Sequence, residues 1–169
     1  MLTLAEIKTE VDRLAGVIGA PASLLPTYGV SRDGAYPHIE VDARQYHYVI
    51  VERGQELERF STRDLDELLE RTFRDVTSTQ SFSHERAHRD PARDSRRMAF
   101  AHQVELLAKL SPTWAAHEEQ RHQDILRTHP FNDEAGLRAT LAGQYMAQGM
   151  APEAAAELAD QQYPKRREA

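Results

Sequence analysis

The chain has 169 residues, of which 40% are hydrophobic and 28% charged, a balance typical of folded domains that argues against wholesale disorder. It contains no cysteine, which excludes a disulfide framework and thiolate chemistry. No run approaches the ~20 apolar residues that a membrane span needs, and the first residues show no apolar leader segment. We therefore expect a cytoplasmic protein with no membrane partner.

The net charge of −6 is unevenly distributed along the chain. The first 80 residues hold 9 Lys and Arg against 14 Asp and Glu, a balance of −5. Such an acidic half disfavours direct binding of nucleic acid, which requires a basic surface. It suits a basic protein partner, because opposite electrostatic potentials speed the encounter of two proteins.

The N-terminal residues carry the signals of an amphipathic helix. Thr3 and Glu6 form a capping box, and apolar residues then recur at helical spacing as far as Ile18. Gly19 and Pro21 are typical of a helix end.

Residues 26–60 predict four strands in an antiparallel meander. Asp33-Gly34 and Arg53-Gly54 favour two-residue hairpin turns, and Ala43-Arg44 is a weaker candidate for the middle turn. Two-residue turns would set four facing pairs: Tyr28 with Ile39, Val41 with Tyr46, Ile39 with Tyr48, and Ile50 with Leu57.

Alternation along these strands assigns the side chains to two faces. The apolar face comprises Tyr28, Val30, Pro37, Ile39, Val41, Tyr46, Tyr48, Ile50 and Leu57. The polar face comprises Ser31, Tyr36, His38, Glu40, His47, Val49, Val51, Glu56, Glu58 and Phe60. We expect Ile39, Val41, Tyr48, Ile50 and Leu57 to pack on Val11, Leu14, Leu65, Leu69 and Phe73. The polar face is then where a function would lie.

The remainder of the chain predicts helices. A second helix follows a cap at Ser61 or Thr62, and residues 78–91 lose periodicity, which indicates a linker or a ragged helix end. Further helices are predicted at 93–110, from Pro112 to His129, from Asn132 to Gly149, and from Pro152. The fold class is therefore α+β: an N-terminal helix, a four-stranded antiparallel meander, then a helical C-terminal half. We expect one domain over 1–133, with 134–169 as a helical extension packed on it.

Two histidine clusters raise the question of catalysis. The run from His84 to His88 matches H-E-x-x-H, but its Arg-rich surroundings offer no apolar helix face for a cleft. On the polar sheet face, His38, His47, Glu40 and Glu58 leave open an alternative, a small metal-dependent enzyme, although cross-strand His–Glu pairing is also ordinary sheet stabilisation. Neither cluster makes a convincing site, so we expect no enzyme activity, catalytic residue, metal or cofactor.

The same polar face offers the residue types of a protein interface, with a tyrosine surrounded by acids. The predicted partner-binding residues are Asp33, Tyr36, His38, Glu40, His47, Glu52, Glu56 and Glu58.

The chain also resembles a known family in several long runs. These are Leu24 to Gly29, Ser31 to Glu40, Tyr46 to Arg59, Thr62 to Leu69, Leu106 to Trp114 and His129 to Phe131. Together they resemble the immunity protein 63 family of bacterial polymorphic toxin systems, over residues 2–133. The resemblance implies a non-enzymatic antidote that occludes the active site of a cognate secreted or contact-delivered toxin C-terminal domain. An acidic inhibitor suits a basic toxin that acts on RNA or nucleotides.

Overall fold

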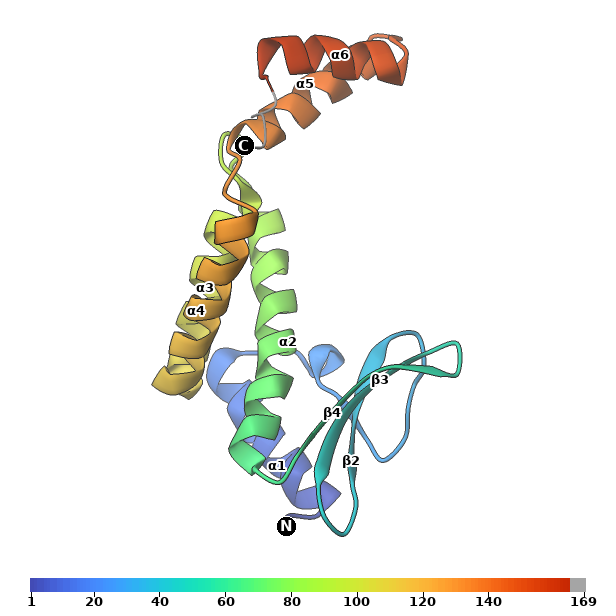
Figure 1. The fold of residues 1–169 in the computed structure, drawn as a ribbon, viewed down its shortest axis with the longest axis vertical. Helices are drawn as coiled ribbons and strands as arrows, with labels where there is room; N and C mark the ends of the chain where they lie inside the picture. The colour runs from blue at the N-terminus through green and yellow to red at the C-terminus, as the bar shows by residue number, and fades with distance from the viewer. Residues whose placement is uncertain (165–169) are drawn as a thin grey trace. The chain divides into compact units, whose positions relative to one another are not determined.

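A computed structural model describes residues 1–164 of the chain (Figure 1). Its elements are α1 (Leu4–Ile18), η1 (Ala22–Leu24), β1 (Thr27–Tyr28), β2 (Tyr36–Val41), β3 (Tyr46–Glu52), β4 (Gln55–Thr62), α2 (Leu65–Ala87), α3 (Ser95–Leu110), α4 (Pro112–Thr128), α5 (Glu134–Ala147) and α6 (Pro152–Gln162). This order confirms the α+β class. Residues 165–169 of the predicted C-terminal extension lie outside the described part.

The chain divides into two compact units. The first combines residues 1–80 with 103–120 and contains α1 and the whole sheet. The second combines residues 81–102 with the chain from 121 onward, including α5 and α6, which pack against each other. Among the described residues, no helix combines the length and the apolar character that crossing a membrane requires.

Helix α1 begins and ends where its sequence predicts. The Thr3 hydroxyl accepts a hydrogen bond from the Glu6 backbone N–H, and the Glu6 carboxylate accepts one from the Thr3 N–H, which completes the capping box. Gly19 ends the helix with a φ of 62°, a left-handed conformation that glycine adopts without steric cost. The helix thereby presents Ile7 and Val11, both fully buried, to the sheet and its neighbours.

The central hairpin of the sheet also agrees with the predicted register. The strand order is β1-β2-β3-β4, with Val41 facing Tyr46 and Ile39 facing Tyr48. Asp42 holds the turn between β2 and β3. Its Oδ1 accepts hydrogen bonds from the backbone N–H groups of Arg44 at 2.6 Å and Gln45 at 2.8 Å.

The first strand pair corrects the prediction of an all-antiparallel meander. Tyr28 does face Ile39, but β1 runs parallel to β2. Asp33, Gly34 and Ala35 have φ values of 60°, 63° and 58°, so the positive φ continues past the two central positions of a type I′ turn. The connection over residues 29–35 returns the chain to the start of β2 without forming a hairpin there.

A β-bulge corrects the register of the last strand. The Arg53-Gly54 turn is as predicted, with Glu52 facing Gln55, but the ladder is irregular between Ile50 and Val51, and Ile50 faces Glu58. Leu57, predicted to be buried opposite Ile50, is the extra residue and is 57% exposed. One inserted residue reverses the faces of all that follow it in the strand.

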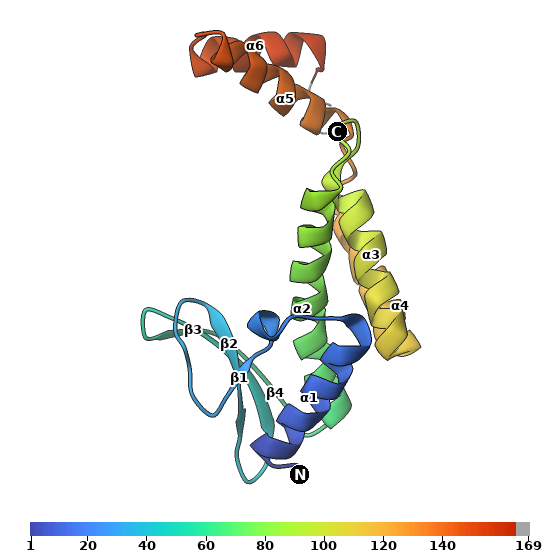
Figure 2. The ribbon, with the colours of Figure 1, turned by 180° about the vertical axis from the view of Figure 1, so that it is seen from behind.

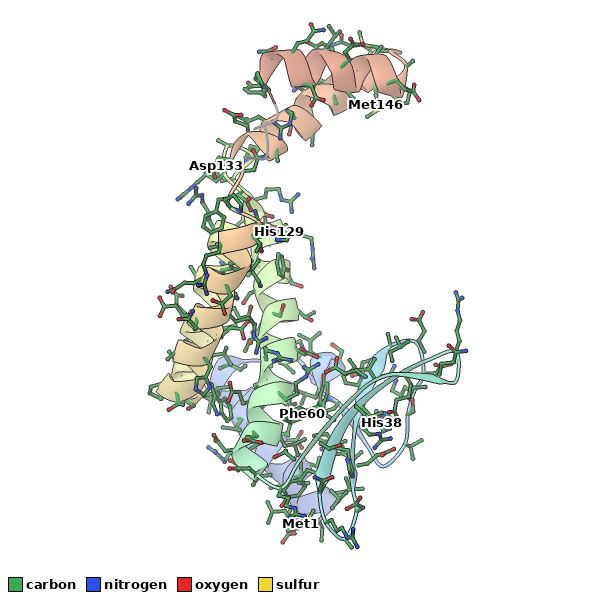
Figure 3. All side chains as sticks on the ribbon, viewed as in Figure 1. Met1, His38, Phe60, His129, Asp133 and Met146 are labelled. Carbon is green, nitrogen blue, oxygen red and sulfur yellow. The ribbon has the colours of Figure 1, made fainter. Side chains whose placement is uncertain are left out.

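The bulge places three side chains on the face opposite to the predicted one. Glu58 and Phe60, predicted on the polar face, lie instead on the face that α1 and α2 cover, while Arg59 takes the opposite face. Figure 3 shows Phe60 on the α2 side of the sheet and His38 on the far side.

The hydrophobic core of the first unit lies between this sheet face and the helices. Helices α1 and α2 lie on the same side of the sheet (Figures 1 and 2). The buried core comprises Ile7, Val11, Leu14, Ala15, Ile18, Leu25, Ile39, Tyr46, Tyr48, Leu68, Leu69, Phe73, Val76, Leu106, Leu107, Trp114 and Ala115. Of the side chains predicted to pack here, Val41, Ile50 and Leu65 are only partly buried.

The prediction of a linker or ragged helix end over 78–91 is wrong for its first ten residues, because α2 continues to Ala87, while residues 88–91 do lie between α2 and α3. Where the stretch begins, Thr77 just before it and Ser81 within it are fully buried, and the Thr77 hydroxyl donates to the Phe73 carbonyl oxygen at 2.6 Å. A buried hydroxyl that bonds to its own helix fills a core position without appearing in a pattern of apolar residues. The hydrophobic periodicity is therefore lost because hydroxyl residues replace apolar residues at buried positions of the same helix.

Candidate functional site

The outer face of the sheet, opposite α1 and α2, brings together several predicted interface residues. We define this outer face by His38, Glu40, His47, Val49, Val51, Glu56, Arg59 and Ser61. His38, Glu40, His47 and Glu56 lie here as predicted, whereas the bulge removes Glu58. Arg59 was missed, because nothing in a run of exposed charged residues reveals a one-residue bulge.

Arg59 links the strands of the outer face through ion pairs. Its guanidinium contacts Glu40 on β2 at 2.8 Å and Glu56 on β4 at 2.7 Å. The other Glu40 oxygen lies 3.0 Å from His38 Nε2. Because β3 lies between β2 and β4, the Arg59 side chain must cross β3 to reach Glu40. Val49, which faces Arg59 in the ladder, is fully buried.

These contacts set the ionisation of the two glutamates. Hydrogen bonds from Arg59 hold the pKa of both Glu40 and Glu56 below the ordinary glutamate value. Both carboxylates are therefore ionised at neutral pH and remain about two-fifths exposed. The outer face therefore carries net negative charge, and Arg59, which both glutamates share, holds the two carboxylates in place.

A second set of contacts lies at the end of this face next to the β2–β3 turn. His47 Nε2 lies 3.0 Å from Asp42 Oδ2, and His47 Nδ1 lies 2.8 Å from the Ser61 hydroxyl. Backbone hydrogen bonds in the turn and the contact with His47 lower the pKa of Asp42 to about 2. Both imidazole nitrogens of His47 are thus engaged in holding the turn to β3 and β4.

Asp42 should make stability depend on pH in the acidic range. Its folded pKa lies below the ordinary value of 3.8, so its stabilising contribution is present above pH 3.8 and is lost as the pH falls toward 2. We expect the Asp42→Asn variant to lose less stability than the parent protein between pH 6 and about pH 2.5. Urea unfolding midpoints at the two pH values measure this, and equal losses would contradict it.

The histidines do not converge on a metal position. His38 and His47 are each engaged by a different carboxylate. In the second unit, the His84 and His88 rings stack at 4.2 Å, and His88 Nδ1 lies 2.9 Å from the His84 carbonyl oxygen. Within residues 1–164, no group of three or more histidine or carboxylate side chains is placed to hold a metal ion.

The remaining predicted residues lie at one end of the sheet, where β2 begins and β3 ends. Asp33 accepts a hydrogen bond from the Gly54 N–H at 3.4 Å, which brings it beside the β3–β4 turn and near the exposed Glu52. Tyr36 is half-buried, and its hydroxyl lies 2.6 Å from the Leu25 carbonyl oxygen. Asp33 and Glu52 are thus accessible acids, whereas Tyr36 anchors β2 to the segment after η1.

Two hollows lie on the helix side of the sheet, between its strands and α2. The larger, of about 460 Å³, is lined by Ser23, Leu24, Ala35, Tyr36, Pro37, Tyr48, Ile50, Asp75, Ser78 and Thr79. The other, of about 340 Å³, is lined by Glu58, Phe60, Glu67, Glu70, Arg71 and Arg74. Ile50 and Glu58 face each other across β3 and β4, so the hollows are adjacent. We call them together the α2 cleft.

Arg71 stands between the two hollows and holds their acids in place. Its guanidinium contacts Glu58 at 2.7 Å and Asp75 at 2.6 Å, and lies 4.4 Å from the centre of the Tyr48 ring. The Tyr48 hydroxyl donates to Asp75 at 2.8 Å. Burial, together with the Asp75 charge, raises the pKa of Tyr48, which keeps this donor protonated. The cleft escaped the sequence analysis because the bulge alone turns Glu58 toward α2.

Comparison with known proteins bears directly on these surfaces. Residues 42–124 match the family model of immunity protein 63. Over this stretch the chain is similar to immunity protein 63. The resemblance seen in the sequence is thereby confirmed for about half of the chain. The searches of curated proteins and of solved structures each found no match.

The immunity protein 63 region contains parts of both surfaces described above. It begins at Asp42 and includes β3, β4, α2 and α3, with His47, Glu52, Glu56 and Glu58 among the predicted residues. Four other predicted residues, Asp33, Tyr36, His38 and Glu40, precede it. The bulged β3–β4 hairpin, which separates the outer face from the α2 cleft, lies entirely within the matched region.

Proposed function

We propose that this protein is an antitoxin, which binds a cognate secreted or contact-delivered bacterial toxin domain and occludes its active site without catalysing a reaction. The immunity protein 63 match over residues 42–124 carries this proposal. The protein would act in the cytoplasm of the cell that makes it. It would need no cofactor, since neutralisation by stoichiometric binding involves no chemical step.

The accessible acids near the β3–β4 hairpin are the proposed contact surface. Glu52, Glu56 and Asp33 are exposed, and Glu40 keeps part of its carboxylate accessible. Anionic groups held in fixed orientations favour a basic partner, because complementary charge raises the association rate and suppresses wrong partners. A toxin that acts on RNA or nucleotides needs a basic cleft and would present that charge. We propose residues 1–133 as the toxin-binding part and 134–169 as an extension.

Co-expression with the neighbouring reading frame, where we expect the toxin domain to be encoded, tests the proposal. The antitoxin should restore growth of cells that make the toxin domain, and the two purified proteins should form a 1:1 complex. Growth arrest that persists at equal expression, together with the absence of a complex, would refute the proposed function.

Acidic steering predicts an association rate that depends on salt. The association rate constant should fall about tenfold or more between about 50 mM and about 500 mM salt, because screening shortens the reach of the acidic field. Glu56→Lys should lower that rate severalfold, with stability changed by no more than about 0.5 kcal/mol. Glu119→Lys on α4, an equally exposed change, is the matched control and should leave the rate unaltered. Salt-independent association would rule out acidic steering.

A further inference from the structure

We infer that the α2 cleft receives a positively charged side chain, arginine or lysine, of the bound toxin. This inference rests on the proposed toxin-binding function and adds to it a defined subsite. It places a contact on the helix side of the β3–β4 hairpin, whereas the sequence pattern directs attention to the outer face alone.

The larger hollow has the form that a long cationic side chain requires. Its volume of about 460 Å³ falls within the roughly 300–1,000 Å³ typical of ligand sites. Leu24, Pro37 and Ile50 supply apolar wall, and Asp75 and Ser78 supply oxygen acceptors. Arginine and lysine combine an aliphatic stem with a charged head, so both halves of such a side chain find matching surface. In Figure 1 the β3–β4 hairpin diverges from α2 toward its turn.

The charges of the cleft favour a cation. Its lining carries four carboxylates against two guanidinium groups. The side chains of Asp75 and Glu58 remain 38% and 44% exposed after pairing with Arg71. A carboxylate offers about four acceptor positions, and Asp75 uses two of them for Tyr48 and Arg71. Acceptors fixed in this way are ready for a further donor without rearrangement.

The same charges argue for a foreign protein over a second copy of this chain. The chain carries a net charge of −6, so self-association through an acidic cleft would bring like charges together. A basic toxin domain has the complementary sign.

Titration with a single amino-acid probe tests the cleft directly. We would follow backbone amide resonances of the ¹⁵N-labelled full chain as N-acetyl-arginine amide is added. Ile50, Ser78 and Thr79 should shift in a saturable manner. The same titration with N-acetyl-citrulline amide, which has a similar shape but no charge, should give at least about tenfold weaker binding, because it cannot form a charge-assisted hydrogen bond. Equal shifts from both probes, or shifts confined to the outer face, would overturn the inference.

Two variants complete the test. Ser78→Arg fills the hollow with the chain's own guanidinium and should abolish the arginine shifts, whereas Ser83→Arg, the same change on an exposed position of the same helix, should not. Asp75→Asn should weaken the probe about tenfold while keeping a hydrogen-bond acceptor for Tyr48. Unchanged probe affinity in Ser78→Arg would refute the subsite.

The toxin complex separates this inference from the proposed function. If Ser78→Arg slows neutralisation and Ser83→Arg does not, the cleft is a toxin contact. If the parent protein neutralises the toxin and Ser78→Arg does so equally well, the function stands and the cleft assignment falls. If the parent protein neutralises no toxin although arginine binds the cleft, the proposed function falls, and with it the toxin as the occupant.

Discussion

Replacement of Phe73 by alanine should lower the free energy of unfolding by about 3–5 kcal/mol, the cost usual for a fully buried phenylalanine. Phe73 is fully buried in the core between α1, the sheet and α2, and its ring stacks on Trp114 with centroids 6.2 Å apart. Truncation removes apolar contacts on all sides and leaves a cavity that rigid neighbours close only in part. Urea or thermal unfolding of the purified variant measures the loss.

Leu57→Ala provides the matched control for this core substitution. Both parent residues are large and apolar, and the predicted sheet faces placed Leu57 in the core as well. Because Leu57 is 57% exposed at the bulge, its truncation should change the unfolding free energy by no more than about 0.5 kcal/mol. A large loss for Leu57→Ala would mean that β4 pairs without the bulge, with Glu58 back on the outer face.

Val49→Ala should cost about 2–3 kcal/mol, more than its position on a polar face would suggest. The change deletes two methyl groups from a fully buried side chain, each worth about 0.8 kcal/mol before the cavity term is added. Ile50→Ala should cost only about 1–2 kcal/mol, since Ile50 is partly exposed at the α2 cleft. The alternating pattern alone predicts the reverse order for the two residues.

The unfolding midpoints of Val49→Ala, Arg59→Ala and the double variant show what causes the loss of stability in Val49→Ala. If Arg59 and its ion pairs cover Val49, then Arg59→Ala should expose the valine and reduce the further cost of Val49→Ala. A double-mutant cycle measures this coupling. Additive losses would show that another part of the chain covers Val49.

The bulge also determines how the proposed toxin contact should be mapped. Glu56 and Glu58 would lie on one face of a regular strand, and a double charge reversal would then report on one surface. In the structure Glu56 pairs with Arg59 on the outer face, while Glu58 pairs with Arg71 at the α2 cleft. Reversing them one at a time separates the two surfaces, because each reversal disturbs a different ion pair.

Local signals were sufficient for most of the secondary structure. The capping box at Thr3, the glycine at 19 and the prolines at 112 and 152 act within one helical turn, so the sequence marks those helix ends directly. The β2–β3 register followed from a two-residue turn at Ala43-Arg44, and alternation then assigned the side chains of the two strands to two faces. The family resemblance likewise rests on linear motifs, and the match over 42–124 confirms it.

Tertiary structure decided the features on which the candidate site depends. The parallel pairing of β1, the bulge at Leu57 and the continuation of α2 past Ser78 cannot be read from periodicity, since each is selected by contacts between residues distant in sequence. Alternation assigns faces only while the ladder is unbroken, and a single inserted residue inverts that assignment. The α+β class, the immunity protein 63 resemblance and the acidic composition could therefore be predicted from linear motifs and residue counts, whereas packing decides which acids face outward and which line the α2 cleft.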